Sequence, residues 1–121
     1  MRRLMTKRML TNVLVDTTAI AKSDRLDNIL LAVKYERVSG TGAGRLYVYG
    51  AMDANANTKY LIGFAPVLTG TRDTDGLVAW TTSVNIMLQI YGVHPYIYIS
   101  WDETTDPARC TVDLYGMEDG N

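Results

Sequence analysis

The chain has 121 residues and a formal net charge of −1, and 47% of its residues are hydrophobic and 21% charged. This composition indicates one globular domain and excludes a disordered chain. No apolar run approaches the ~18 residues that a membrane helix needs, and no unbroken apolar segment of a secretory signal follows the basic start.

The first ten residues, MRRLMTKRML, hold four of the 12 basic residues and no acidic one. Eight basic residues then face 13 acidic ones in residues 11–121, which therefore carry a net charge of −5. We predict a basic N-terminal arm over residues 1–12, an acidic body over 13–117 and a short acidic tail over 118–121. Nucleic acid binding depends on neutralisation of phosphate charge by basic residues. The negative charge of the body therefore argues against such binding, and only the arm could touch nucleic acid.

Alternation of side chains with a period of two is the dominant pattern after the arm, and it predicts β-strands. The alternating segments are residues 29–36, 45–50, 84–91, 96–101 and 110–115, and residues 13–20 and 59–65 are weaker candidates. Turns rich in Gly, Asn, Asp and Pro separate them, at 39–44, 53–57, 69–76, 92–95 and 102–107. We predict an all-β fold: a single antiparallel β-sandwich, jelly-roll- or immunoglobulin-like, with about seven or eight strands and an extended N-terminal arm.

Residues with catalytic or metal-binding chemistry are scarce. His94 is the only histidine, and it precedes Pro95 at the start of a predicted strand, which indicates a turn residue. Cys110 is the only cysteine, so no intrachain disulfide can form, and its place in an alternating strand predicts a buried core residue. A catalytic triad needs a histidine beside a nucleophile and a zinc site needs three or four ligands. We predict no catalytic residue, no metal, no cofactor and no enzymatic activity.

Two loops resemble ligand-binding motifs. The stretch Gly40-Thr41-Gly42-Ala43-Gly44-Arg45 resembles a phosphate-binding loop, but a predicted strand follows it where a helix is needed, so we predict a hairpin loop. The stretch Asp73-Thr74-Asp75-Gly76 resembles the opening of a calcium loop, but Val84 stands at the twelfth position, which excludes an EF-hand. A looser calcium site stays open, one that would also use Asp102, Glu103 or Asp106.

Four tyrosines fall on the strand faces opposite to the aliphatic residues. If the aliphatic side chains of residues 46–48 and 97–99 fill the core, these rings point outward and form a half-exposed aromatic surface, which is typical of interfaces. Two alternatives remain: cross-strand pairs that only shield the sheet, and a patch that stacks on sugar rings. The predicted partner-binding residues are those of the arm and of this surface: Arg2, Arg3, Lys7, Arg8, Tyr47, Tyr49, Tyr96 and Tyr98.

Four segments resemble small β-sandwich modules in virion proteins of tailed bacteriophages. They are LYVYGAMD at 46–53, YLIG at 60–63, PYIYISW at 95–101 and CTVDLYG at 110–116, so the resemblance covers about residues 45–116. The order of strands and turn residues carries it. The chain departs from the usual pattern at Ala51, where the turn commonly has Ser, and at Tyr98-Ile99, where an Arg is common.

The resemblance implies a structural protein without catalytic residues. We therefore expect a bacteriophage virion protein, an auxiliary or decoration capsid, head–tail or tail component, that is assembled in the host cytoplasm. It would dock non-covalently to the major capsid protein or other virion subunits, with a homo-oligomer possible and no membrane contact. Deletion of residues 1–10 is expected to abolish incorporation and leave the fold intact. The alternative is a carbohydrate-binding β-sandwich module for attachment to a host surface.

Overall fold

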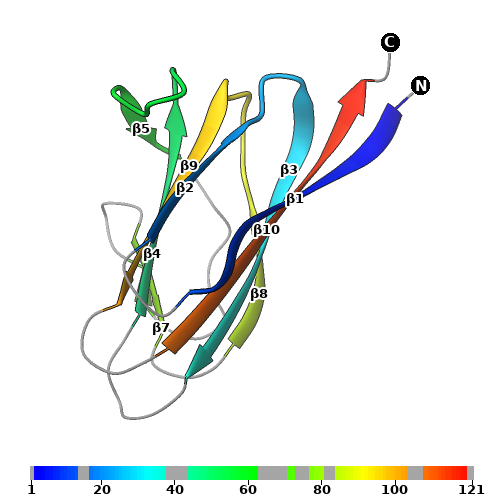
Figure 1. Cartoon of the computed structure of the whole chain (residues 1–121). Coiled ribbons are helices and arrows are strands. Elements are labelled where there is room, and N and C mark those ends of the chain that lie inside the picture. The colour runs from blue at the N-terminus through cyan, green and yellow to red at the C-terminus, as the bar shows by residue number, and fades with distance from the viewer. Residues whose placement is uncertain are drawn as a thin grey trace.

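The computed structural model describes residues 2–13, 17–37, 44–62, 71–72, 77–80, 84–103 and 108–119. Ten β-strands and no helix occur in these ranges (Figure 1). The strands are β1 (Arg2–Val13), β2 (Thr17–Lys22), β3 (Leu26–Arg37), β4 (Gly44–Ala51), β5 (Lys59–Leu61), β6 (Thr71–Arg72), β7 (Leu77–Trp80), β8 (Val84–Gln89), β9 (Tyr96–Glu103) and β10 (Ala108–Asp119).

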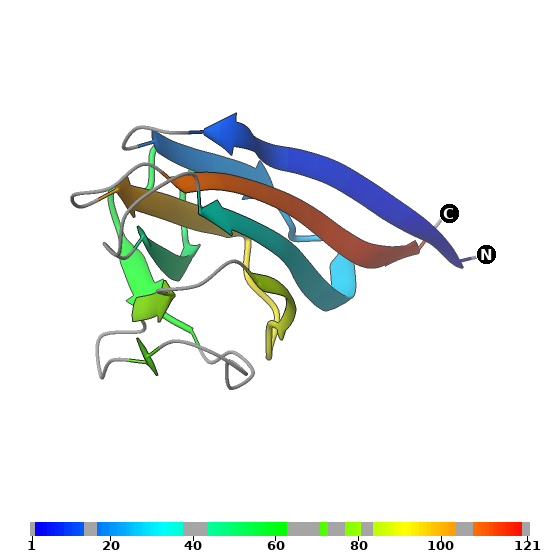
Figure 2. The same ribbon diagram turned by 90° about the horizontal axis from the view of Figure 1, so that it is seen from below.

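Two antiparallel sheets make up the fold (Figures 1 and 2). A four-stranded sheet has the order β1-β10-β3-β8, and a six-stranded sheet has the order β2-β9-β4-β7-β6, with β5 paired to β4. Seven strands have six residues or more, while β5, β6 and β7 are short. The predicted all-β antiparallel sandwich is confirmed. The segment 69–76, predicted as a loop, differs in part, because residues 71–72 form β6.

The core lies between the sheets and consists of the alternate, mostly aliphatic side chains that the sequence predicted to be buried. From the four-stranded sheet it takes Leu31, Val33, Leu88, Val112 and Leu114, and from the six-stranded sheet Leu46, Val48, Ile97, Ile99 and Trp101. Tyr35 and Trp101 join the two layers, with ring centroids 5.7 Å apart. Successive strand residues point to opposite faces of a sheet. When alternate residues are buried in the core, the residues between them lie on the outer surface of that sheet.

Residues 2–13 differ from the predicted arm, because they form β1, an edge strand of the four-stranded sheet. The pairing with β10 runs from Arg2 opposite Asp119 to Val13 opposite Cys110. Leu10 is buried in the core at 3% exposure. The predicted boundaries after residues 12 and 117 therefore do not separate an arm or a tail from the sandwich: β1 runs to Val13 and β10 runs to Asp119.

Cross-strand charges help to explain why such a basic segment pairs here. Arg3 Nη2 lies 3.3 Å from Glu118 Oε2, and Arg8 Nε donates a hydrogen bond to Asp113 Oδ1. Opposite charges on facing strands stabilise a sheet pair. Arg3 and Arg8 of β1 thus face acidic residues of β10 that lie more than 100 positions away in the sequence.

The turn between β8 and β9 is fixed from two sides. Ser23 Oγ donates a hydrogen bond to the carbonyl oxygen of His94, and the Ser23 amide donates to the carbonyl of Pro95. The His94 ring lies against Gly50 of β4, where an added Cβ would lie only 2.5 Å from Nδ1, and its Nε2 lies 2.8 Å from the carbonyl oxygen of Tyr91. His94 is the turn residue that the sequence predicted.

Substitution of Gly50 by Ala is expected to lower the free energy of unfolding by about 1–3 kcal/mol, because the new methyl group would overlap the imidazole ring. Urea unfolding measures the change. The double variant Gly50→Ala with His94→Ala should recover much of the loss, since the ring that clashes is then gone. A loss unchanged in the double variant would contradict this steric explanation.

Candidate functional site

The predicted tyrosines lie on the outer surface of the six-stranded sheet. Tyr49 of β4 is directly opposite Tyr98 of β9, Tyr47 is opposite Ser100, and Tyr96 is opposite Ala51. All four tyrosines are half-buried. Their neighbours in the sequence, such as Val48 and Ile97, are fully buried, so the sheet turns the tyrosines outward.

Three of the rings touch one another. The Tyr47 and Tyr49 centroids are 6.5 Å apart with planes 6° from parallel, and the Tyr49 and Tyr98 centroids are 6.1 Å apart at 49°. The ammonium group of Lys59 lies 4.9 Å from the centroid of Tyr98, within the range of a cation–π interaction. We call these four residues, Tyr47, Tyr49, Tyr98 and Lys59, the tyrosine face. The cross-strand pairing and the half-exposed surface that the sequence left as alternatives therefore occur together.

The predicted basic residues lie in the other sheet, so the structure does not bring them together with the tyrosines. Arg3, Lys7 and Arg8 are exposed on β1, and Arg2 begins that strand. The hydrogen bond to Asp113 raises the pKa of Arg8 above its ordinary value, so its guanidinium stays charged. The eight predicted residues thus form two separate surfaces on different layers.

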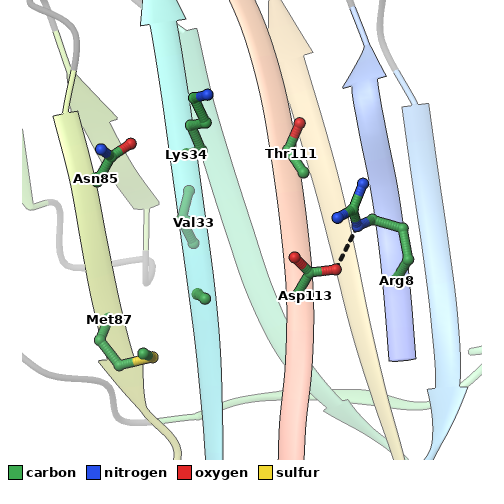
Figure 3. Close-up of a pocket in the computed structure, with 8 residues that line it drawn as sticks. Arg8, Val33, Lys34, Asn85, Met87, Thr111 and Asp113 are labelled. Atoms are coloured by element: carbon green, nitrogen blue, oxygen red, sulfur yellow. Dashed lines mark hydrogen bonds and ion pairs between the residues drawn. The ribbon is translucent and has the colours of Figure 1, made fainter. Parts of the chain in front are cut away.

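A shallow depression of about 500 Å³ lies on the outer surface of the four-stranded sheet (Figure 3). Its floor is the small residue Ala32, which lies in register between Asp113 of β10 and Met87 of β8. Its rim consists of Arg8, Lys34, Asn85, Met87, Thr111 and Asp113. No sequence pattern had predicted this depression. The only signal was the small Ala32 among the longer side chains that alternate with the core residues over 30–36. This signal predicts a depression only when the neighbouring strands are known.

Asp53 closes the turn between β4 and β5. Its carboxylate accepts hydrogen bonds from the backbone amides of Asn55, Asn57 and Thr58. These bonds, with that from Asn57 the largest cause, lower the pKa of Asp53. The carboxylate thus organises the turn itself.

The described residues contain neither a metal-binding group nor a membrane-spanning helix. Among those residues no group of three or more His, Cys, Asp or Glu side chains is placed to hold a metal ion. In the same ranges no helix is long and apolar enough to cross a membrane. Residues 40–43 of the glycine-rich loop lie outside the described residues. The same holds for Asp73–Gly76 and Asp106 of the possible calcium site. The side chains of Asp102 and Glu103 are likewise not described.

Cys110 is fully buried in β10, and burial raises the pKa of its thiol to about 12. Because the thiolate is the reactive form, we expect the native protein to resist a maleimide reagent at neutral pH. The same reagent should modify Cys110 quantitatively once urea unfolds the chain, which serves as the control, and mass spectrometry measures both. Rapid modification of the folded protein would contradict the buried placement.

Among known proteins, only solved structures show a similarity to this chain, and that similarity is distant. No family model matches the sequence, and no curated protein matches it. One similar solved structure is a protein of Bacillus endospore appendages, which form disulfide-linked pili: identity is 14%, with 100% of this chain and 92% of that chain covered and a TM-score of 0.42. Another is the SPBc2 prophage-derived protein YomS: identity is 11%, with 93% and 95% covered and a TM-score of 0.40. At these values the likeness assigns no function to this chain.

Proposed function

We propose that this protein is a structural component of a bacteriophage virion, which docks onto neighbouring subunits without catalysis. The single observation that carries the proposal is the tyrosine face, in which Tyr47, Tyr49 and Tyr98 form one continuous cluster on the outside of a sheet. Tyrosine is enriched in protein interfaces because a large apolar ring is combined with a hydroxyl group that can still form a hydrogen bond.

Two further features support this role. The resemblance of residues 45–116 to virion sandwich modules includes β4 and β9, the strands that carry the tyrosines. In addition, the rings already contact one another, so they lose little side-chain freedom when a partner covers them. Low ordering cost is what allows a small aromatic cluster to contribute strongly to binding. The auxiliary capsid, head–tail and tail positions all fit this mode of docking.

Carbohydrate binding is a second candidate, and one specific observation favours it. The planes of Tyr47 and Tyr49 are only 6° from parallel, so the two rings present similarly oriented surfaces along β4. A row of parallel aromatic rings on a sheet can stack on the apolar faces of sugar rings. Lys59 at the border of the tyrosine face would then contact hydroxyl or acidic groups of the glycan.

Truncation of the tyrosine face tests the proposal. In the double variant Tyr49→Ala with Tyr98→Ala, we expect the number of copies per purified phage particle to fall to background, because central aromatic anchors contribute about 2 kcal/mol or more each. Quantitative mass spectrometry of particles assembled from the phage genome that encodes the chain measures the copy number.

Tyr115→Ala is the matched control, because Tyr115 is also half-buried but lies on β10 of the other sheet. This variant should be incorporated at the wild-type level, and circular dichroism should show the same strand content in all proteins. Full incorporation of the double variant, or absence of the wild-type chain from particles, would contradict the proposal. Binding to a glycan array that is lost in the double variant would favour the carbohydrate alternative.

A further inference from the structure

The free edge of β1 is long and regular. Within the described residues, β1 is the last strand of its sheet and pairs with β10 alone. The register is unbroken from Arg2 to Arg8, and the shifts begin only between Arg8 and Leu10. Figure 2 shows β1 along the outer border of the molecule, with no strand drawn beyond it. Every second residue over 2–8 therefore directs its backbone N–H and C=O groups away from β10.

A groove of about 190 Å³ lies directly beside this edge, on the core-facing side of β1. Residues of β1, of β10, of the β2–β3 turn and of the two strand ends beside that turn line it, and its apolar part comes from Met5, Leu26 and Leu114. Its charged part consists of Lys7, Lys22, Asp24, Arg25 and Glu118. A strand added to β1 would point alternate side chains toward this groove, and such pockets supply specificity in β-strand addition while the backbone supplies affinity.

The charges around the edge select the kind of strand that can be added. Three cationic side chains face two carboxylates in the groove, and one of those carboxylates, Glu118, already pairs with Arg3. The side chains of Lys7, Lys22 and Arg25 are exposed and lie along the groove. The net positive potential of this border therefore favours an acidic segment.

A second copy of β1 fits the edge poorly. Antiparallel self-pairing centred on Met5 would place Arg2 opposite Arg8 and Arg3 opposite Lys7. Parallel pairing in register would place each basic residue opposite itself. Like charges directly opposite each other destabilise a strand pair, and basic residues on an edge strand prevent such self-association.

We propose that the edge of β1 over Arg2–Arg8 receives an extended acidic segment of a partner protein as an added strand, with an apolar side chain of that segment seated beside Met5 and Leu26. This inference rests on the proposed docking function and adds a second docking surface, in the other sheet from the tyrosine face. The partner is defined by its chemistry: an extended segment in which acidic residues alternate with apolar ones.

The probe is a short capped peptide in which Glu alternates with Val, compared with its Lys–Val counterpart. The isolated full chain is titrated with each peptide, and NMR measures amide hydrogen exchange. With the Glu–Val peptide, the alternate amides of residues 2–8 that point away from β10 should become protected. With the Lys–Val peptide they should stay unprotected.

A charge reversal on the edge gives the matched comparison. Lys7→Glu should weaken binding of the Glu–Val peptide by about tenfold or more, because an attraction becomes a repulsion. Lys34→Glu makes the same change in net charge on the exposed outer surface of β3, away from the groove, and should leave the affinity near that of the wild type. The thermal midpoint of each variant confirms that it is folded.

Several results would overturn the inference. They are equal binding of the two peptides, protection outside β1, no binding at all, or an equal loss in the Lys7→Glu and Lys34→Glu variants. Protection of β1 that rises with protein concentration in the absence of peptide would show self-pairing instead. The Tyr49→Ala, Tyr98→Ala variant should bind the peptide as the wild type does, so a failure at the edge leaves the tyrosine-face proposal intact.

Discussion

Deletion of residues 1–10 is expected to destabilise the whole sandwich rather than to remove a dispensable arm. The deletion takes away most of β1, and with it the cross-strand pairing from Arg2 through Arg8 to Leu10. Loss of the buried Leu10 side chain alone corresponds to about 2–5 kcal/mol, a large part of the ~5–15 kcal/mol that holds a typical domain folded. The deletion also exposes the edge of β10 that pairs with β1. Urea unfolding followed by circular dichroism measures the loss.

The charges of β1 provide the control for this deletion. The variant Arg3→Gln with Arg8→Gln removes the Arg3–Glu118 and Arg8–Asp113 ion pairs but keeps the strand and Leu10. Exposed ion pairs contribute little to stability, so this variant should unfold close to the wild-type midpoint. If the deletion variant were as stable as the full chain, β1 would not belong to the sandwich, and the simpler arm that the sequence suggested would be correct.

Substitution of Trp101 by Ala is expected to lower the free energy of unfolding by about 3–5 kcal/mol. Trp101 is fully buried in β9, between β2 and β4, and it contacts Tyr35 across the two layers. Removing the indole would leave a cavity at the centre of the core, where rigid strands can close it only in part. Urea unfolding with circular dichroism detection gives the value directly.

Trp101→Phe separates the effect of volume from that of the indole N–H. Within the described residues, the buried Nε1 atom of Trp101 has no hydrogen-bond partner, and an unpaired buried donor costs about 1–3 kcal/mol. Phe keeps a ring and removes this donor, so it should be clearly less destabilising than Ala. Equal losses for Phe and Ala would show that the N–H group carries an important bond.

Alternation in the sequence predicted the strands that have one face in the core and the other face on the surface. In β4, β9 and β10 the sequence alternates, and Leu46, Ile97 and Val112 are buried as predicted. The outward direction of Tyr47, Tyr49 and Tyr98 follows from the same alternation, so three of the four residues of the tyrosine face could be located from the sequence. What the sequence could not give was the pairing of β4 with β9, because the register joins segments about 50 residues apart.

The edge strand β1 escaped prediction for a physical reason. Residues 2–8 project along the border of the molecule, and only Met5 among their described side chains is half-buried, so burial imposes no alternation on them. Their pairing partners lie in β10, Asp113 and Glu118 among them, and no local sequence window includes both strands. The same reasoning explains the missed depression around Ala32, whose walls come from four strands.

The pairing of β1 with β10 also constrains how the chain reaches its native state. Arg3 and Glu118 are 115 positions apart, so β1 meets its sheet partner only after β10 has been synthesised. Closing so large a loop is slow, and β-sheet proteins with such high contact order fold in milliseconds to seconds. Until then β1 has no strand to pair with in its own sheet. Its basic side chains are well suited to keep this unpaired segment from aggregating.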